Sequence, residues 1–579
     1  MDNGKYFIGI CIGHNATVSV IRNGVVLDAI SEERFRNIKN YDGFPSETLG
    51  YFREKYALSE KNIARVTTNF KYLGPQMLSD RRQKASLQFL LRKLIRIAGY
   101  YIPFISILEF ALYKKYMKIF GTHYAKRQRR TIADFLNIDM AKVSSCEHHA
   151  AHAYSAYFGS PFRDEEVLVL TLDGEGDFLA GSVNIARDNT LHRIAEIPMT
   201  YSVGIVYNKL TRHLGMKPLE HEYKIMGLAP YAKPEYYMPL YDRIKKLLFI
   251  DTRNRVLMKG KFNTHMIDLW MKKNLHEARF DNIAGAFQKL TENLMIKWIK
   301  NCIDETKIKK VAVAGGVFMN VKANKLILEI DGIEDLFIFP SPGDESTPIG
   351  AAMYSYISDT GKLPAPVTHN YWGVEYSNED IKSFLDVERI HEKYTVEYHD
   401  DIAAIIAGLI SQDRIVAVMQ GRMEFGARSL GNRSILSNPS NRNIIEKLNN
   451  AIKGRDFWMP FAGAILEERA LDYIINPKKH FSPYMVNAFD TTELGKKEFA
   501  AAIHPYDKTI RPQMVRKAWN PKFHAILREF EKKTGIGGVL NTSFNLHGYP
   551  IVLGPKEAIW VFENSELDYL ALENYLIKK

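Results

Sequence analysis

The chain contains 579 residues, of which 46% are hydrophobic and 25% charged, and this is the composition of a folded globular protein. It excludes a largely disordered, collagen-like or disulfide-dense chain. The length suits roughly three to four structural units. Three cysteines, Cys11, Cys146 and Cys302, lie far apart without metal-site spacing, which indicates a reducing, cytoplasmic compartment.

The N-terminal residues lack the pattern of a secretion signal, and no stretch reaches the roughly 18 charge-free apolar residues of a membrane span. Residues 97–113 come closest, but Pro103 and Glu109 interrupt them. We therefore expect this segment to be soluble or interfacial.

The formal net charge of +12 is a local feature. Residues 81–130 hold 13 lysines and arginines against the single acid Glu109, so this window accounts for the whole excess. Apolar side chains recur at helical spacing from Leu87 to Ala98, which predicts an amphipathic helix. Two interpretations stay open: a solvated face on helices packed against the main domain, or a basic surface for an anionic acceptor, a membrane or an acyl chain.

Two segments of the N-terminal part share one plan. Residues 5–13 form an apolar β-type run, and a hairpin that turns at Asn23–Gly24 follows. Near residue 166 an apolar strand, a turn rich in glycine and aspartate, and a second strand occur again. Glycine-containing turns follow strands at 315–316 and 340–344. Two related α/β halves closing on a nucleotide are the expected arrangement, because glycines let backbone N–H groups approach phosphate oxygens.

A proline-containing break at 363–373 predicts a domain boundary. Beyond it the α/β pattern resumes, with buried strands expected at 414–421 and 537–545. We therefore expect two α/β domains in succession.

A pair of histidines predicts a metal centre. His148 and His152 are four residues apart in a helical pattern, so both imidazoles lie on one face and can bind one ion. Asp173 and Asp344, both expected at strand-end turns, are the best further oxygen ligands. This ligand set suits Fe(II), Mn or Zn, and the sequence does not choose among them. Helix-surface histidines beside turn aspartates remain the alternative.

Residues 13–15 and 31–40 supply a second set of candidates. His14 is expected on a turn between strands, where an imidazole can act as a base or orient a hydroxyl group. Lys39 can neutralise negative charge that develops during a reaction. Taken singly, each residue fits an ordinary surface role equally well.

Basic and polar residues in the C-terminal part predict a phosphate site. Arginine forks bind phosphate and carboxylate oxygens two at a time. Short amide and hydroxyl donors in the segment 541–545, at a strand end, suit phosphate or carbamoyl oxygens. Scattered surface arginines and an Asx-type turn explain any one segment but not all of them together. The basic residues concerned are Arg422, Arg428, Arg433, Lys453, Arg455 and Arg511.

Six motifs in one order resemble the NodU/CmcH-type O-carbamoyltransferases. They are HHAAHA (148–153), EYKIMGLAPYA (222–232), AGGVFMN (314–320), PSPGD (340–344), GARSLGNRSIL (426–436) and NTSFN (541–545). The resemblance covers nearly the whole chain except residues 60–135. It implies an α/β protein with a two-lobed actin/Hsp70-like (Kae1-like) domain at 1–365, carrying a basic helical insertion at about 74–132, and a YrdC-like α/β domain at 366–579.

The resemblance implies an ATP-dependent O-carbamoyltransferase. Carbamoyl phosphate and ATP would give carbamoyl-adenylate in the C-terminal domain, with release of pyrophosphate. The metal-bearing N-terminal domain would then transfer the carbamoyl group to a hydroxyl of a sugar or natural-product acceptor, as in nodulation-factor or antibiotic biosynthesis. The expected cofactors are Fe(II) or another divalent metal and Mg-ATP, with carbamoyl phosphate as co-substrate.

Matching positions within these motifs imply roles for individual residues. The metal ligands would be His148, His152 and Asp344, with Asp173 beside them, and the transfer residues His14 and Lys39. A nucleotide in the N-terminal domain would contact Lys224, Gly227, Gly315, Gly316 and Asn320. Carbamoyl phosphate and ATP would contact Arg428, Lys453, Arg455, Arg511, Asn541, Ser543 and His547.

Three alternatives stay open. The first alternative is a threonylcarbamoyl-type tRNA-modifying enzyme, whose positive charge would spread along an RNA-sized surface. Because the positive charge of this chain is concentrated in residues 81–130, no nucleic-acid partner is expected. The second alternative is an actin-like sugar kinase, which gives the histidine pair and the C-terminal arginines no function. The third alternative is a non-catalytic actin-like nucleotide-binding protein. The expected partners are a small-molecule hydroxyl acceptor, anionic or lipid-like, a membrane surface contacted through 81–130, and a second copy in a homodimer.

Overall fold

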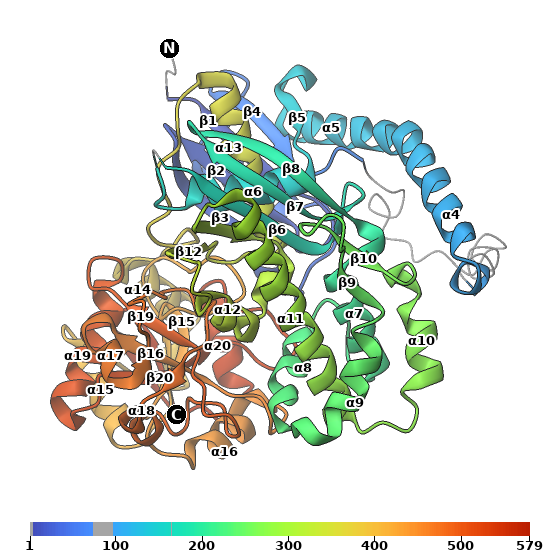
Figure 1. Ribbon diagram of the computed structural model, residues 1–579. Helices are drawn as coiled ribbons and strands as arrows, with labels where there is room; N and C mark the ends of the chain where they lie inside the picture. The colour runs from blue at the N-terminus through green and yellow to red at the C-terminus, as the bar shows by residue number, and fades with distance from the viewer. Residues whose placement is uncertain (1–3, 73–96, 164) are drawn as a thin grey trace. The chain divides into compact units, whose positions relative to one another are not determined.

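A computed structural model of the protein describes residues 4–72, 97–163 and 165–579 (Figure 1). The chain forms two compact units. Unit 1 comprises Met1–Glu32 and Asn40–Val367, and unit 2 comprises Glu33–Lys39 and Thr368–Lys579. The segment Glu33–Lys39, which the sequence analysis assigned to the N-terminal domain, therefore belongs to unit 2.

Unit 1 contains two five-stranded sheets of the same topology, with the strand orders β3-β2-β1-β4-β5 and β8-β7-β6-β11-β12. In each sheet the first three strands in the chain are antiparallel neighbours, and the last two run parallel to the first. The first sheet consists of β1 (Tyr6–Cys11), β2 (Thr17–Arg22), β3 (Val25–Ser31), β4 (Ile63–Thr68) and β5 (Val143–Ser145). The second consists of β6 (Val167–Gly176), β7 (Leu179–Arg187), β8 (Thr190–Pro198), β11 (Lys310–Ala314) and β12 (Asp335–Ile338).

The two sheets repeat one plan because their sequences repeat it. Every residue of β1 is buried, as expected of an apolar strand at the centre of a covered sheet. Asn23 and Gly24 turn the first hairpin where predicted, with φ angles of 52° and 76°. The duplicated α/β topology confirms the predicted actin-like fold class of the N-terminal part.

The second hairpin differs in detail from the prediction. It turns at Asp177 and Phe178, whose φ angles are 47° and 74°. Strand β6 therefore continues beyond Leu172 to Gly176, and its pairing with β7 is irregular between these two residues. Asp173 lies in this irregular part of a strand, not at the strand-end turn that we predicted.

Helices α6 (His148–Gly159) and α13 (Thr347–Thr360) lie side by side (Figure 1). Two glycines permit the close approach of α13 to its neighbours. A Cβ on Gly350 would lie 1.8 Å from the carbonyl oxygen of Ala151, and one on Gly9 would lie 1.7 Å from that of Pro348. Helix α6 begins at His148 and α13 begins three residues after Asp344, so this packing brings the two candidate metal residues together.

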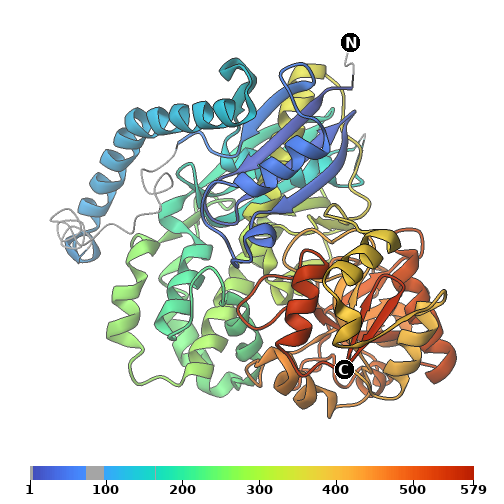
Figure 2. The same ribbon diagram turned by 180° about the vertical axis from the view of Figure 1, so that it is seen from behind.

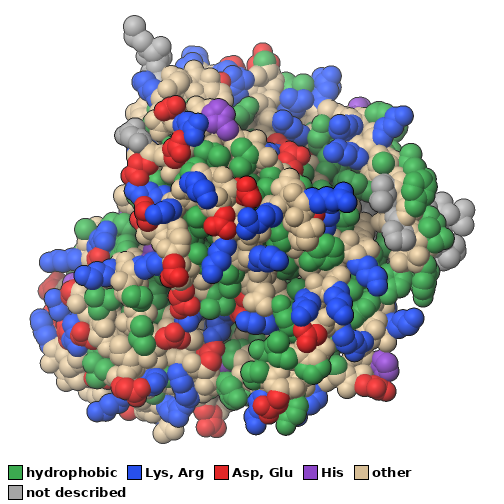
Figure 3. All heavy atoms as spheres, viewed as in Figure 1, with side chains coloured by type: hydrophobic (Ala, Val, Ile, Leu, Met, Phe, Trp, Pro, Cys, Tyr) green, Lys and Arg blue, Asp and Glu red, His purple; other side chains and the backbone are tan. Residues whose placement is uncertain are grey.

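The basic region contributes an extended helical arm to unit 1, as Figures 1 and 2 show. It consists of α4 (Pro103–Tyr116), a π-helical turn (Met117–Gly121) and α5 (Thr122–Leu136). Hydrophobic side chains gather along its outer edge (Figure 3). The helix predicted over 87–98 lies almost wholly outside the described residues. No helix of the described part of the chain is both long enough and apolar enough to cross a membrane.

The remaining helices of unit 1 form a helical part that contacts the second sheet through α7 and α11. They include α7 (Val203–His213), α8 (Glu222–Leu228), α9 (Pro234–Ile244), α10 (Ile267–Asn274), α11 (Phe280–Thr306) and α12 (Val321–Leu328). Helix α2 (Ser46–Lys55) lies beside the first sheet. The long α11 contacts α8, α9 and α12, so it links most of this helical part.

Unit 2 is built on one mixed eight-stranded sheet with the order β13-β22-β21-β14-β15-β20-β16-β19. Only β14 with β21 and β16 with β19 pair in parallel. Helices α15 (Ile402–Ser411) and α19 (Pro521–Thr534) pack against each other beside it. The strands are β13 (Thr395–Tyr398), β14 (Val416–Met419), β15 (Arg433–Ser437), β16 (Ala462–Leu466), β19 (Pro512–Val515), β20 (Gly538–Ser543), β21 (Tyr569–Leu572) and β22 (Tyr575–Lys578).

The segment Glu33–Lys39 is fixed to unit 2 by Arg34, whose side chain is buried. Its guanidinium donates to the carbonyl oxygen of Gly426 at 2.7 Å and to that of Ile551 at 3.1 Å. Two hydrogen bonds from a charged donor are each stronger than a neutral pair, so the segment is firmly held.

Replacing Gly350 by alanine should lower the free energy of unfolding of unit 1 by about 3 kcal/mol or more, because the added methyl group overlaps the Ala151 carbonyl. Chemical denaturation measures the loss. Gly50→Ala is the matched control: Gly50 lies inside α2 with nothing within 4 Å, so there alanine should stabilise by about 0.5–1 kcal/mol. Equal denaturation midpoints for Gly350→Ala and the parent would show that α6 and α13 are not in tight contact.

Candidate metal centre and anion site

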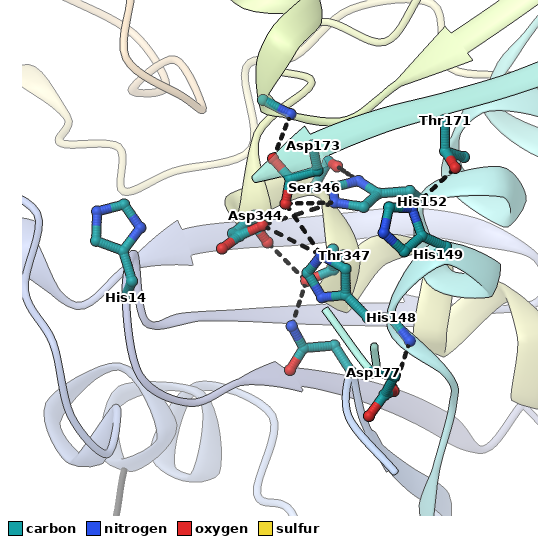
Figure 4. Close-up of polar contacts among 12 residues, drawn as sticks. His14, His148, His149, His152, Thr171, Asp173, Asp177, Asp344, Ser346 and Thr347 are labelled. Atoms are coloured by element: carbon teal, nitrogen blue, oxygen red, sulfur yellow. Dashed lines mark hydrogen bonds and ion pairs between the residues drawn. The ribbon is translucent and has the colours of Figure 1, made fainter. Parts of the chain in front are cut away.

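Four buried or half-buried side chains of unit 1 converge as the sequence predicted. The Nε2 atom of His148 lies 3.2 Å from Oδ2 of Asp173 and 3.5 Å from Oδ1 of Asp344. The Nε2 atom of His152 lies 3.9 and 3.6 Å from the same two oxygens. One ligand atom from each residue falls within 4.8 Å of all the others, a spacing that one metal ion can bridge (Figure 4).

The cluster leaves polar atoms without partners. Nε2 of His152 and Oδ1 of Asp344 are buried and make no hydrogen bond with the described residues. Buried polar atoms are normally satisfied, and each exception in a folded protein calls for a cause. Two nitrogen and two oxygen donors turned toward one point fit a divalent ion, which would occupy those lone pairs.

Protonation of the four side chains is strongly coupled. Burial disfavours charge on His148, but the hydrogen bond to Asp173 and the charge of Asp344 outweigh it and raise the pKa of His148 to about 9. Burial and the charge of His148 lower the pKa of His152 to about 3. Burial and the charge of Asp173 raise the pKa of Asp344 well above its usual range. The cluster therefore holds protons in the absence of a cation, and a metal ion would have to displace them.

Neighbouring groups orient the candidate ligands. Oδ1 of Asp173 accepts a hydrogen bond from the backbone N–H of Gly316 at 2.8 Å, which leaves Oδ2 for the cluster. Nδ1 of His152 lies 3.3 Å from the hydroxyl of Ser346. Phe70 stacks on the ring of His148 at a centroid distance of 4.8 Å. Such contacts fix ring orientation and ligand direction in metal sites.

The start of α6 is held by two acidic residues that the sequence analysis did not identify. The carboxylate of Glu147 caps the helix by accepting from the N–H groups of His149 and Ala150, and it pairs with Arg193. Asp177 accepts from the backbone N–H of His148 at 3.0 Å and also from those of Lys71 and Tyr72. Glu147 directly precedes HHAAHA, so its role as a helix cap could have been predicted from the sequence. The contact of Asp177 with the backbone of His148 could not, because it depends on the geometry of the second hairpin.

The diglycine turn serves the metal cluster. We predicted that Gly315 and Gly316 offer backbone N–H groups to a nucleotide. Both groups are already used, by the carbonyl oxygen of Pro342 at 2.7 Å and by Asp173 at 2.8 Å. A Cβ on Gly316 would lie 2.6 Å from Oδ1 of Asp173, so glycine is needed for the carboxylate to approach. This use differs from the phosphate-binding role predicted for the turn.

The other predicted nucleotide contacts are dispersed. Asn320 caps α12 and exchanges two hydrogen bonds with Gln288, at 2.9 and 3.1 Å. Lys224 and Gly227 lie on α8, half-buried and buried respectively. Their nucleotide contact stays a prediction.

His14 lies on the turn after β1, and its charge acts on Asp344. Figure 4 shows it on the Asp344 side of the cluster. Its Nε2 atom is buried and makes no hydrogen bond with the described residues. Lys39, the other predicted transfer residue, belongs to unit 2, where its charge acts on Lys453.

Unit 2 contains a cluster of cations. Burial together with the charges of Arg455 and Lys39 lowers the pKa of Lys453 well below its usual range. Burial and the charges of Arg428 and Arg455 likewise lower the pKa of Arg511. Arg511 makes no hydrogen bond or ion pair with any described residue, and its Nε is buried. Five cations that repel one another fit an anion of several charges, such as a phosphate ester.

The polar residues around these cations take different roles. The ammonium group of Lys453 donates to Oδ1 of Asn545 at 2.9 Å and to the carbonyl oxygens of Ser543 and Asn545. Arg455 donates to the hydroxyl of Thr542 at 3.0 Å. The end of β20 thus holds two of the cations in place.

Three other residues were predicted to belong to the phosphate site of the C-terminal part, and the structure places them as follows. Both amide protons of Asn541 are donated within unit 2, to Ser429 and Gln513, so this side chain does not offer the ligand donor we predicted. Arg433 is fully buried and donates to backbone carbonyl groups, including those of Gln420 and Val374, so it is a structural residue. His547 is exposed on the turn after Asn545.

The described residues thus contain a cluster that could hold a cation in unit 1 and a cluster of cations in unit 2. Residues 6–353 match the family description "Carbamoyltransferase N-terminus", and residues 407–579 match "Carbamoyltransferase C-terminus". The chain therefore belongs to the carbamoyltransferase family.

Two relatives and one solved structure illustrate the similarity. An uncharacterized protein of Methanocaldococcus jannaschii is 33% identical over 99% of this chain and 99% of its own length. Nodulation protein NolNO of Sinorhizobium fredii is 28% identical over 98% of this chain and 79% of its own length. Component A of the (R)-2-hydroxyglutaryl-CoA dehydratase of Acidaminococcus fermentans is 13% identical, with a TM-score of 0.33, over 61% of this chain and 99% of its own.

Replacing both His148 and His152 by alanine should reduce bound metal from about one ion per chain to a small fraction of that, because only two oxygen ligands remain. Elemental analysis of purified protein measures the content. His149→Ala is the matched control on the same helix, since Nδ1 of His149 bonds Thr171 at 2.9 Å and the residue lies outside the ligand set. Full metal content in the double variant would place the ion elsewhere.

Replacing Arg511 by glutamine should raise the thermal unfolding midpoint by about 1–3 °C, because it relieves repulsion within the cation cluster. The same change should shrink the stabilisation that added pyrophosphate gives, since one cation for the anion is lost. Arg516→Gln is the control: Arg516 pairs with Glu467 at 2.7 Å, so its loss should lower the midpoint and leave the pyrophosphate effect intact. A lowered midpoint for Arg511→Gln would mean that the cluster is not under repulsion.

Proposed function

We propose that the protein is an ATP-dependent O-carbamoyltransferase in which unit 2 activates the carbamoyl group and unit 1 transfers it to an acceptor hydroxyl. The observation that carries the proposal is the cation cluster around Arg511, in the unit that bears the carbamoyltransferase C-terminal match. Carbamoyl phosphate and ATP both present phosphate oxygens, and a half-buried guanidinium that has no partner among the described residues suits them.

The activation step follows from these charges. Water cleaves carbamoyl phosphate to carbamate and inorganic phosphate. A carbamate oxygen then attacks the α-phosphorus of ATP, the bond to the β-phosphate breaks, and pyrophosphate leaves with carbamoyl-adenylate as the product. Arg428, Arg455 and Arg511 stabilise the negative charge that accumulates on the phosphates. Lys453, held by Ser543 and Asn545, adds a fixed positive charge beside them.

The transfer step uses unit 1. The oxygen of the acceptor hydroxyl attacks the carbamoyl carbon, the bond to AMP breaks, and AMP leaves. His14 is suited to take the hydroxyl proton at its Nε2, which makes no hydrogen bond with the described residues. His148, His152, Asp173 and Asp344 would hold a divalent ion, for which Fe(II) is our proposal, and that ion would polarise the carbonyl group. The acceptor that we infer is a sugar or natural-product hydroxyl.

The kinase alternative is less well supported. An actin-like kinase would use the glycine turns of unit 1 to hold nucleotide phosphates. The N–H groups of Gly315 and Gly316 are instead donated within the unit, and the cation cluster would have no role. A binding protein without catalysis would retain both clusters but would release no pyrophosphate.

Pyrophosphate release from ATP should require carbamoyl phosphate in the parent protein. Arg428→Ala should slow this release at least about a hundredfold, because one stabilising charge in the anion site is lost. Arg414→Ala, an exposed arginine of unit 2, is the control and should match the parent. The His148→Ala/His152→Ala double variant should still release pyrophosphate.

The acceptor is tested separately. Hydroxyl compounds offered with ATP and carbamoyl phosphate should gain the mass of one carbamoyl group, and the double histidine variant should give no product. Parent-rate pyrophosphate release by Arg428→Ala, or release independent of carbamoyl phosphate, would refute the assignment of unit 2.

A further inference from the structure

The arm of unit 1 exposes large apolar side chains in a regular row. Phe104, Leu108, Leu112 and Tyr116 recur every four residues along α4, which places them on one side of the helix. Ile119 and Phe120 continue the row on the π-helical turn. Phe104 is 69% exposed and Ile119 60%, values far from those of a buried helix face. An apolar surface of this extent on a folded unit marks an interaction site.

Basic side chains flank the row. Lys114, Lys115 and Lys118 are exposed on α4 and the turn that follows it. Lys126, Arg127 and Arg130 are exposed on α5. From residue 104 to residue 131 the sequence contains one acid, Glu109. The arm thus joins an apolar surface to a positive charge.

This combination identifies the occupant. A second copy of the chain would place these lysines against their own counterparts, and like charges in an apolar interface are unfavourable. A nucleic acid would neutralise the lysines but leave Leu108, Leu112 and Ile119 exposed. At an anionic bilayer surface the apolar row enters the acyl boundary, the lysine ammonium groups reach the phosphates, and the tyrosines occupy the interface.

We propose that the α4 arm is a peripheral docking element for anionic lipid surfaces, with the row Phe104–Phe120 inserted at the headgroup boundary. Each lysine near an anionic surface strengthens the attraction, and the apolar row supplies the salt-independent part of the binding. The arm lies on the surface and does not cross it, since no described helix can span a membrane.

The arm is joined to the metal-centre side of unit 1. The ring of Tyr113 lies 6.2 Å from that of Phe178, edge to face, and the ammonium group of Lys114 lies 5.8 Å from the same ring. Phe178 follows Asp177, which holds the backbone of His148. A protein docked through the arm therefore has this turn, and the start of α6 beneath it, near the lipid surface.

Flotation of the full-length protein with vesicles tests the proposal. Vesicles of phosphatidylglycerol and phosphatidylcholine should carry the parent protein, and vesicles of phosphatidylcholine alone should carry much less. The double change Lys115→Ala, Lys118→Ala should weaken binding to the anionic vesicles by about thirtyfold; Lys114 is left unchanged because its ammonium group contacts the Phe178 ring. The triple change Phe104→Ser, Leu108→Ser, Leu112→Ser should weaken it at least as much and should also remove binding that persists at high salt.

Matched controls use exposed residues elsewhere. Lys272→Ala with Lys273→Ala on α10, and Val387→Ser with Leu471→Ser in unit 2, should bind as the parent does. All the changed positions are at the surface, and thermal unfolding checks that each variant folds. The proposal fails if the parent does not float with anionic vesicles, or if either arm variant retains parent binding. It also fails if the apolar change only abolishes self-association, or the lysine change only abolishes RNA binding.

Discussion

The central constraint on unit 1 is that its fold must hold two carboxylates and two imidazoles together in one buried cluster. Asp173 and Asp344 repel each other when both are ionised, and burial adds to the penalty. The unit tolerates this because β6, α6 and α13 are held by contacts that do not involve the charges: the glycine-mediated approach of α13, the capped start of α6, and the bond from Gly316 to Asp173. The repulsion is thus maintained by the surrounding fold, as expected of a site built for a cation.

The two units contain clusters with opposite excess charge. In unit 1 the excess is negative, and the hydrogen bond to Asp173 together with the charge of Asp344 raises the pKa of His148 to about 9. In unit 2 the excess is positive, and Arg511 lies half-buried among cations with no hydrogen-bond or ion-pair partner among the described residues. In the absence of ligands, the fold would be more stable without the clustered charges of either unit. The two clusters fit ligands of opposite charge, a cation in unit 1 and an anion in unit 2.

Sequence reasoning succeeded where one short segment determines the outcome. Helical spacing was enough to place His148 and His152 on one face, and Asn23–Gly24 was enough to locate the first hairpin turn. It could not reveal the acceptor for the Gly316 N–H or for the Asn541 amide, because Asp173 and Ser429 are more than a hundred residues away and Gln513 nearly thirty. It also assigned Asp173 to a turn, since a bulged strand and a turn share the same glycine-rich composition.

Arg34 ties seven residues from the first tenth of the chain into the C-terminal unit. Expression of residues 368–579 alone would yield a fragment whose Gly426 and Ile551 carbonyl groups have lost their guanidinium donor. Splitting the gene at the apparent boundary between the units would therefore not yield two self-sufficient proteins. A segment from the first tenth of the chain is thus part of the structure of the C-terminal unit.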